Sequence, residues 1–195
     1  MLCGFLLVHL MGNMLLYAGA EAFNNYAYAL TSKKAILYSA EFVLLGLFGT
    51  HIVLALKLAK ENRAARGAVR YAVNAQSGDM NIFTRTMPYS GAWILVFLIL
   101  HLINFKYAPN AMVDGQINLY NVVVEHFKLL HWSIYYIVTM AIISGHVYHG
   151  VQSSLQTFGI NHPRHNGLIK VVSLIYALVI FVGYSSFPVY FLIKG

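Results

Sequence analysis

Five long apolar stretches constrain what this chain can fold into more than any other feature. They cover residues 1–23, 35–58, 88–107, 130–158 and 168–193. Each is long enough, or nearly so, to cross the hydrocarbon of a bilayer, where a segment must be helical or part of a closed barrel. The stretches lack the alternation of barrel strands. The sequence therefore predicts an all-α transmembrane bundle of five helices, forming a single domain.

Composition excludes a soluble protein. Of the 195 residues, 59% are hydrophobic and only 10% are charged, whereas soluble domains carry about 25% charged residues. Five spans leave only short connections, so no separate soluble catalytic domain is expected. Residues 108–125 contain proline, glycine, asparagine and aspartate, and they predict a loop with a short surface helix near residues 122–127.

The basic residues predict the orientation of the chain. The formal charge is +7, and in a membrane protein Lys and Arg are retained on the cytoplasmic side, so this charge does not indicate nucleic-acid binding. The second and fourth connections carry eight basic residues: Lys57, Lys60, Arg63, Arg66, Arg70, Arg85, Arg164 and Lys170. The opposite side carries five: Lys33, Lys34, Lys106, Lys128 and Lys194. We expect a cytoplasmic N-terminus, an external C-terminus, and a basic second connection that meets anionic lipid or a protein partner, or is simply solvated.

Histidine is unusually abundant, with nine residues against six Asp and Glu. Four of the five apolar stretches contain a histidine: His9, His51, His101, and His146 with His149. An ionisable side chain at membrane depth is costly and normally faces the bundle interior. Imidazole is a common axial ligand of haem iron, and four such helices supply two bis-histidine haems. A single membrane histidine, by contrast, often only bonds a neighbouring helix.

Depth sorts these histidines into two levels. His51 and His146 both lie in the cytoplasmic half of their helices, whereas His101 lies in the outer half. His9 is then the only candidate partner for His101, and it reaches that level only if the first helix leaves the membrane near residues 17–21. That span is barely complete. The sequence leaves open whether residues precede Met1 in the natural chain or the first helix is simply short.

The other histidines receive different interpretations. His149 lies one helical turn from His146 on a similar face, so it is an alternative ligand, a partner for a haem propionate, or a quinone contact. The remaining four, which flank the fourth helix or lie in a polar loop, are expected to be ordinary interfacial residues: His126, His131, His162 and His165. Three further polar residues are candidates for contact with propionates or quinone: Tyr89, Ser90 and Ser153.

Two segments carry a resemblance to a known family. The first helix reads FLLVHLMGN around His9, and the fourth reads SGHVYHGVQSSLQTFGI around His146. With one histidine on each of four successive helices, the chain resembles the membrane-anchor cytochrome b subunits of succinate dehydrogenase and fumarate reductase, in the bacterial five-helix, two-haem form. The resemblance extends from the first helix to the last.

The resemblance implies specific roles for these residues. His9 and His101 would hold a distal haem b near the outer face, and His51 and His146 a proximal haem b near the cytoplasm, with His146 selected over His149. Glu21 loosely resembles an acid at the quinone site of some members, although it could equally be a solvated acid. Some members carry a glutamate two residues before the fourth-helix ligand, where this chain has Ser144, so proton transfer by that route is not expected.

The resemblance also implies partners and a location. The chain would transfer electrons between an iron–sulfur subunit and membrane quinone, expected to be menaquinone, in the bacterial cytoplasmic membrane. A flavoprotein with covalent FAD would complete the cytoplasmic part of this respiratory complex, which could form a higher oligomer. No dicarboxylate site is expected in this chain. The sequence does not choose between succinate oxidation and fumarate reduction.

Two alternatives follow from the same residues. One is the haem b subunit of another quinone-linked complex, of the formate dehydrogenase or hydrogenase type. The other is a haem-free transporter with a histidine relay, which predicts paired acids at mid-membrane or helices broken near the midplane. Glu41 and Pro188 lie near the outer ends of their helices and do not supply such a site.

Overall fold

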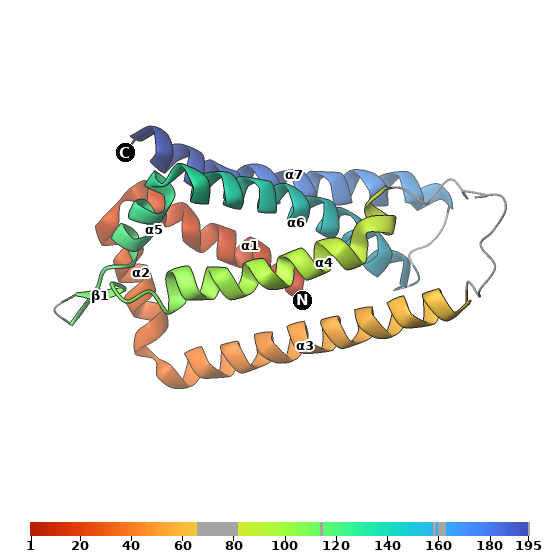
Figure 1. The fold of residues 1–195 in the computed structure, drawn as a ribbon, viewed down its shortest axis with the longest axis horizontal. Coiled ribbons are helices and arrows are strands. Elements are labelled where there is room, and N and C mark those ends of the chain that lie inside the picture. Colours follow the sequence, from red (N-terminus) through yellow and green to blue (C-terminus); the bar gives the residue numbers. More distant parts are fainter. Residues whose placement is uncertain (66–81, 114, 158, 160–162, 195) are drawn as a thin grey trace.

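The computed structural model describes residues 1–65, 82–113, 115–157, 159 and 163–194, and it is helical apart from one short hairpin (Figure 1). The α-helices are α1 (Leu2–Asn13), α2 (Ala20–Ser32), α3 (Lys34–Ala65), α4 (Ile82–His101), α5 (Leu119–Lys128), α6 (Leu130–Thr157) and α7 (Pro163–Lys194). A 3₁₀-helix over Met14–Ala18 follows α1, and a π-helical turn over Leu102–Lys106 follows α4. The hairpin pairs β1 (Met112–Val113) with β2 (Gln116–Ile117).

Four helices in the described part of the chain are long and apolar enough to cross a membrane. They cover Lys34–Ala64, Thr86–Lys106, Leu130–Leu155 and Asn166–Lys194, close to four of the five predicted spans. In these segments the backbone groups bond within their own helix, as lipid requires, except for the bonds that Pro88 and Pro188 cannot donate. The prediction of an all-α membrane bundle is confirmed at this level.

The first predicted span differs from the structure. Its apolar helix covers only Leu2–Ala18, and the chain then turns at Gly19, whose φ of 99° lies in the region that favours glycine. Beyond the turn, the more polar residues of α2 form a separate helix, and Asn24 Oδ1 accepts a bond from the Tyr120 backbone N–H at 2.9 Å. One continuous helix over residues 1–23 is therefore wrong, and residues predicted as a connection are mostly helical.

The surface helix predicted near residues 122–127 is present as α5. It begins at Leu119, three residues earlier than expected, and buries Val123 and Phe127 on its apolar face. Figure 1 shows α5 and α2 gathered at the end of the bundle where α7 finishes. This arrangement closes that end with two short helices and the hairpin.

Hydrogen bonds from tyrosines of α7 fix the position of α1. The Tyr176 hydroxyl donates to the Cys3 carbonyl at 2.8 Å, and the Tyr184 hydroxyl donates to the Leu6 carbonyl at 2.7 Å. A Cβ at Gly183 would come within 2.6 Å of Leu10 Cδ2, so glycine permits the close approach of the two helices. These contacts hold α1 parallel to α7 and thereby position His9.

Helix α3 packs differently from the rest of the bundle. None of the residues in its most apolar 18-residue window is buried, whereas 22% of the corresponding windows of α6 and α7 are buried. Figure 1 shows that α3 runs along one side of the other long helices, apart from them. Near its start, Glu41 Oε2 forms an ion pair with Lys106 Nζ at 2.6 Å, which ties α3 to the end of α4.

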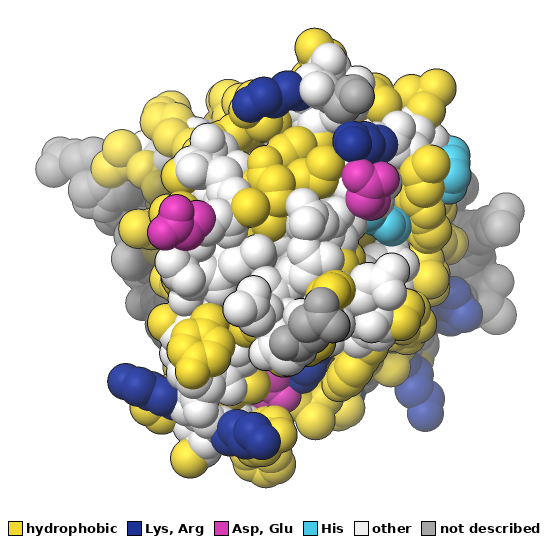
Figure 2. All heavy atoms as spheres, turned by 90° about the vertical axis from the view of Figure 1, so that its left-hand side faces the viewer, with side chains coloured by type: hydrophobic (Ala, Val, Ile, Leu, Met, Phe, Trp, Pro, Cys, Tyr) yellow, Lys and Arg dark blue, Asp and Glu magenta, His cyan; other side chains and the backbone are white. Residues whose placement is uncertain are grey.

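The charges at this end of the bundle are mixed. Figure 2 views it directly and shows a few basic and acidic side chains, some of them adjacent, among apolar and polar ones. Lys128 pairs with Glu125 at 3.1 Å, in addition to the Lys106–Glu41 pair. At the opposite end, four of the predicted basic side chains lie outside the described part of the chain: Arg66, Arg70, Arg85 and Arg164.

Candidate haem-ligand histidines

His9 and His101 lie close together, with nearly perpendicular ring planes, between α1 and the end of α4. Their ring centroids are 5.9 Å apart and their planes are inclined by 87°. Phe5, one turn before His9, stacks on its ring at 5.4 Å, and the Tyr184 ring lies 6.0 Å away. The ring of His9 is thus held from both its own helix and α7.

Aromatic side chains surround His101. The ring centroids of Phe97 and Phe105, one turn before and after it, lie 5.5 Å and 5.2 Å away. The Tyr136 hydroxyl lies 3.5 Å from His101 Nδ1, near the limit of a hydrogen bond. The surroundings are apolar, which favours a neutral imidazole able to bind a metal.

His51 of α3 and His146 of α6 form a second pair of the same kind. Their centroids are 6.2 Å apart and their planes are inclined by 78°. Ser90 Oγ lies 2.9 Å from His146 Nδ1 and donates its own hydrogen to the Met87 carbonyl at 3.1 Å. With its hydrogen directed to Met87, Ser90 can accept a bond from Nδ1–H of His146, and in that tautomer Nε2 keeps a lone pair for a metal.

Both pairs have the separation that one haem iron requires. Metal–nitrogen bonds of about 2 Å to each imidazole place the two ring centroids roughly 6 Å apart. His51 is exposed on α3, and no residue of the apolar window of this helix is buried, so α3 is not packed tightly on the bundle beside this pair. The residues present therefore fit a haem in the separation of their imidazoles and in the loose packing of α3.

The two pairs lie at different levels of the bundle. On α6, Tyr136 contacts His101, and His146 follows ten residues later. On α4, Ser90 bonds His146, and His101 follows eleven residues later. With a rise of about 1.5 Å per residue, the two levels are roughly 15 Å apart, about half the thickness of the hydrocarbon.

The other predicted residues fall outside these two pairs. His149 is half-buried one turn beyond His146, and Glu21 is exposed in the first turn of α2. Ser144 donates to the Ala177 carbonyl at 2.6 Å, which is a bond between α6 and α7. His131 is exposed, whereas His162 and the side chain of His165 lie outside the described residues.

Two neighbouring residues of α4 have roles that sequence reasoning missed. Ser90 was expected to meet a propionate or quinone, but it bonds His146 instead. A Cβ at Gly91 would lie 3.7 Å from His146 Cε1, so this position borders the ring. Only the register of α4 against α6 reveals these contacts, and no local motif marks them.

Replacing Ser90 by alanine should weaken haem binding at the His51–His146 site about tenfold, because loss of an outer-shell partner typically costs 10- to 100-fold in metal affinity. The His146 ring would lose the acceptor that fixes its tautomer, and the reduction potential at this site should rise. Redox titration and haem retention in detergent measure both effects. Ser90→Thr keeps the hydroxyl and should behave like the wild type; equal losses in both variants would contradict this role.

In the described part of the chain, no group of three or more His, Cys, Asp or Glu side chains is arranged to hold a metal ion. A bis-histidine haem needs only two axial side chains, so this finding bears little on the pairs described above. No protein-family model, no curated protein and no solved structure matches the chain.

Proposed function

We propose that this chain is the membrane-anchor cytochrome b subunit of a succinate:quinone oxidoreductase, a succinate dehydrogenase or fumarate reductase. It would carry electrons between an iron–sulfur subunit on the cytoplasmic side and quinone in the membrane. The observation that carries the proposal is the approach of two histidine pairs, at two levels, with the separation expected for axial haem ligands.

His9 with His101, and His51 with His146, would each hold one haem b. When bound, haem supplies reversible one-electron redox chemistry whose potential depends on the axial ligands and their surroundings. Ser90 orients the His146 ring, and the aromatic side chains around His101 exclude water. The two sites therefore differ in local polarity, which gives the chain a means of setting two different potentials.

The spacing of the two histidine pairs suits electron transfer across the membrane between two haem sites. The levels lie about 15 Å apart by helical rise, and α4 carries two aromatic side chains between them, Trp93 and Phe97. The indole N–H of Trp93 bonds Thr139 Oγ1 at 3.1 Å, and Phe97 packs on Tyr135, Tyr136 and His101. These aromatic side chains pack along α4 between the levels of the two pairs.

The soluble partner distinguishes this function from that of a formate dehydrogenase or hydrogenase subunit. When an affinity-tagged chain is purified from its native membranes, we expect a flavoprotein with covalent flavin and an iron–sulfur subunit to copurify. Succinate should then reduce the haem of the complex. Copurification of a formate- or hydrogen-oxidising partner, with haem reduced by formate or hydrogen and not by succinate, would overturn the assignment.

A further inference from the structure

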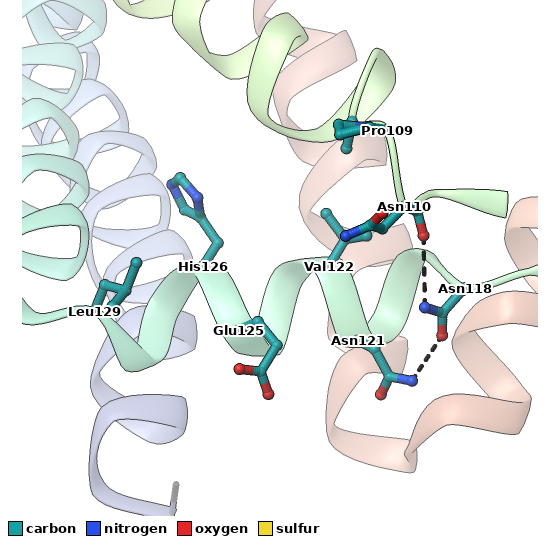
Figure 3. A pocket seen from close by; sticks show the side chains of 9 residues that line it. Pro109, Asn110, Asn118, Asn121, Val122, Glu125, His126 and Leu129 are labelled. Carbon is teal, nitrogen blue, oxygen red and sulfur yellow. Dashed lines mark hydrogen bonds between the residues drawn. The ribbon is translucent and has the colours of Figure 1, made fainter. Parts of the chain in front are cut away.

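A cavity with a mixed polar and apolar lining lies beside α5, at the end of the bundle nearer the His9–His101 pair. Its volume is about 340 Å³, and it is open to the surface, which is within the range of roughly 300–1,000 Å³ typical of small-molecule sites. Figure 3 shows His126, Val122 and Leu129 projecting from one face of α5, with Pro109 and Asn110 opposite Val122. The lining thus combines four apolar residues with five polar ones, among them Glu125, whose carboxylate pairs with Lys128.

His126 is the most constrained polar group of this cavity. Its ring packs on Trp132 at 4.6 Å and on Phe105 at 5.1 Å. The Asn104 amide nitrogen lies 3.4 Å from His126 Nε2; if it donates to Nε2, the proton of a neutral ring is on Nδ1. Burial, assisted by His131, lowers the pKa of His126 to about 4, so the imidazole is neutral near pH 7. In the tautomer that accepts from Asn104, Nδ1–H is the donor.

A single aromatic ring joins the cavity to the outer histidine pair. The Phe105 centroid lies 5.1 Å from that of His126 and 5.2 Å from that of His101. Tyr136 makes a parallel connection, 5.5 Å from His126 and 6.2 Å from His101. A redox-active molecule bound beside His126 would therefore lie close to the distal haem site.

We propose that this cavity binds the quinone headgroup, with His126 donating a hydrogen bond from Nδ1 to a quinone carbonyl. The inference rests on the proposed function and names the site at which that function meets quinone. Leu129 is 48% exposed at the cavity rim, so it offers an apolar surface to an isoprenoid tail. Glu21, the acid suggested by resemblance, is exposed on α2 and does not line the cavity.

In the direction of quinol oxidation, a quinol bound in the cavity loses two electrons and two protons to become a quinone. A haem held by His9 and His101 would supply the one-electron acceptor for these electrons, and the Phe105 ring lies between that pair and the cavity. The protons leave from the open side of the cavity to water. Quinone reduction is the same step reversed.

The test uses the detergent-solubilised complex and menadiol, the two-electron-reduced form of 2-methyl-1,4-naphthoquinone. Anaerobic stopped-flow absorbance measures the rate of haem reduction by menadiol. We expect His126→Ala to slow this rate about tenfold, the effect of losing one well-placed hydrogen bond. His126→Gln retains an N–H donor and should recover most of the rate. His131→Ala removes an exposed histidine outside the cavity. Because burial is the larger cause of the lowered pKa of His126, the His126 ring stays neutral in this variant and the rate should be unchanged.

Haem content and complete reduction by dithionite are measured in each variant, to separate failure of the proposed function from failure of the quinone site. A complex without haem would refute the proposed function itself. Normal haem content with an unchanged menadiol rate in His126→Ala would overturn only the quinone site. The site is also wrong if Glu21→Gln slows the reaction and His126→Ala does not. It is wrong as well if vesicles of anionic phospholipid lower the menadiol rate by competition, because the cavity would then be a site for a lipid headgroup.

Discussion

Replacing His101 by alanine should lower the haem content from two haems per chain to one. The side chain would no longer supply the outer site with its second axial ligand, whereas His51 and His146, roughly 15 Å away by helical rise, would keep theirs. His9→Ala should have the same effect, because the two rings belong to one site. A pyridine haemochrome assay on the purified variants measures the loss.

An exposed histidine provides the control for this experiment. His131→Ala removes an imidazole from the start of α6, outside both pairs, and should retain two haems. Redox titration shows which haem is missing, because the two sites differ in their surroundings. If His101→Ala loses the haem of the His51–His146 site and keeps the other, the proposed pairing is wrong.

Replacing Gly91 by leucine should remove the haem of the His51–His146 site while leaving that of the His9–His101 site. Even the first carbon of a side chain at this position would lie 3.7 Å from His146 Cε1. The three additional carbons of leucine would extend into the space of the imidazole, and a packed bundle accommodates such overpacking only by displacing its neighbours. The expected result is one haem per chain, held by His9 and His101.

Gly91→Ala is the matched control, because a Cβ at 3.7 Å is in ordinary van der Waals contact. It should bind two haems and show spectra close to those of the wild type. The retained outer haem in Gly91→Leu shows that the bundle still folds. Two fully bound haems in Gly91→Leu would mean that His146 is not a ligand in the arrangement described, and His149 would then be the residue to replace.

The four long spans could be predicted from the sequence because their signal is local. A run of about 20 apolar residues has few stable structures in lipid other than a helix, and α3, α4, α6 and α7 lie where such runs occur. The first helix could not be predicted as well. Its apolar run continues past Gly19, and only the packing of α2 on α5 makes that glycine a turn.

The histidine pairs were accessible from the sequence for a different reason. Depth along a spanning helix is nearly a linear function of residue number, so His51 and His146 could be matched in level without knowledge of the packing. The structure brings these two rings together, and likewise those of His9 and His101. Their binding of haem is still a prediction.

Side-chain partners could not be predicted in this way. The bond from His146 to Ser90 depends on the rotation of α4 and α6 about their axes. His126 looked like an ordinary interfacial residue, and its place among Phe105, Trp132 and Tyr136 depends on how α5 folds back onto the bundle. Such contacts join residues from different helices, and the sequence alone does not specify their geometry.

The haem content of the purified wild-type chain tests the central claim most directly. A pyridine haemochrome assay, calibrated against protein concentration, should give two haems b per chain, because two histidine pairs each lie at the separation expected of axial ligands. A protein purified without haem absorption, or with one haem per chain under conditions that preserve the fold, would contradict the account.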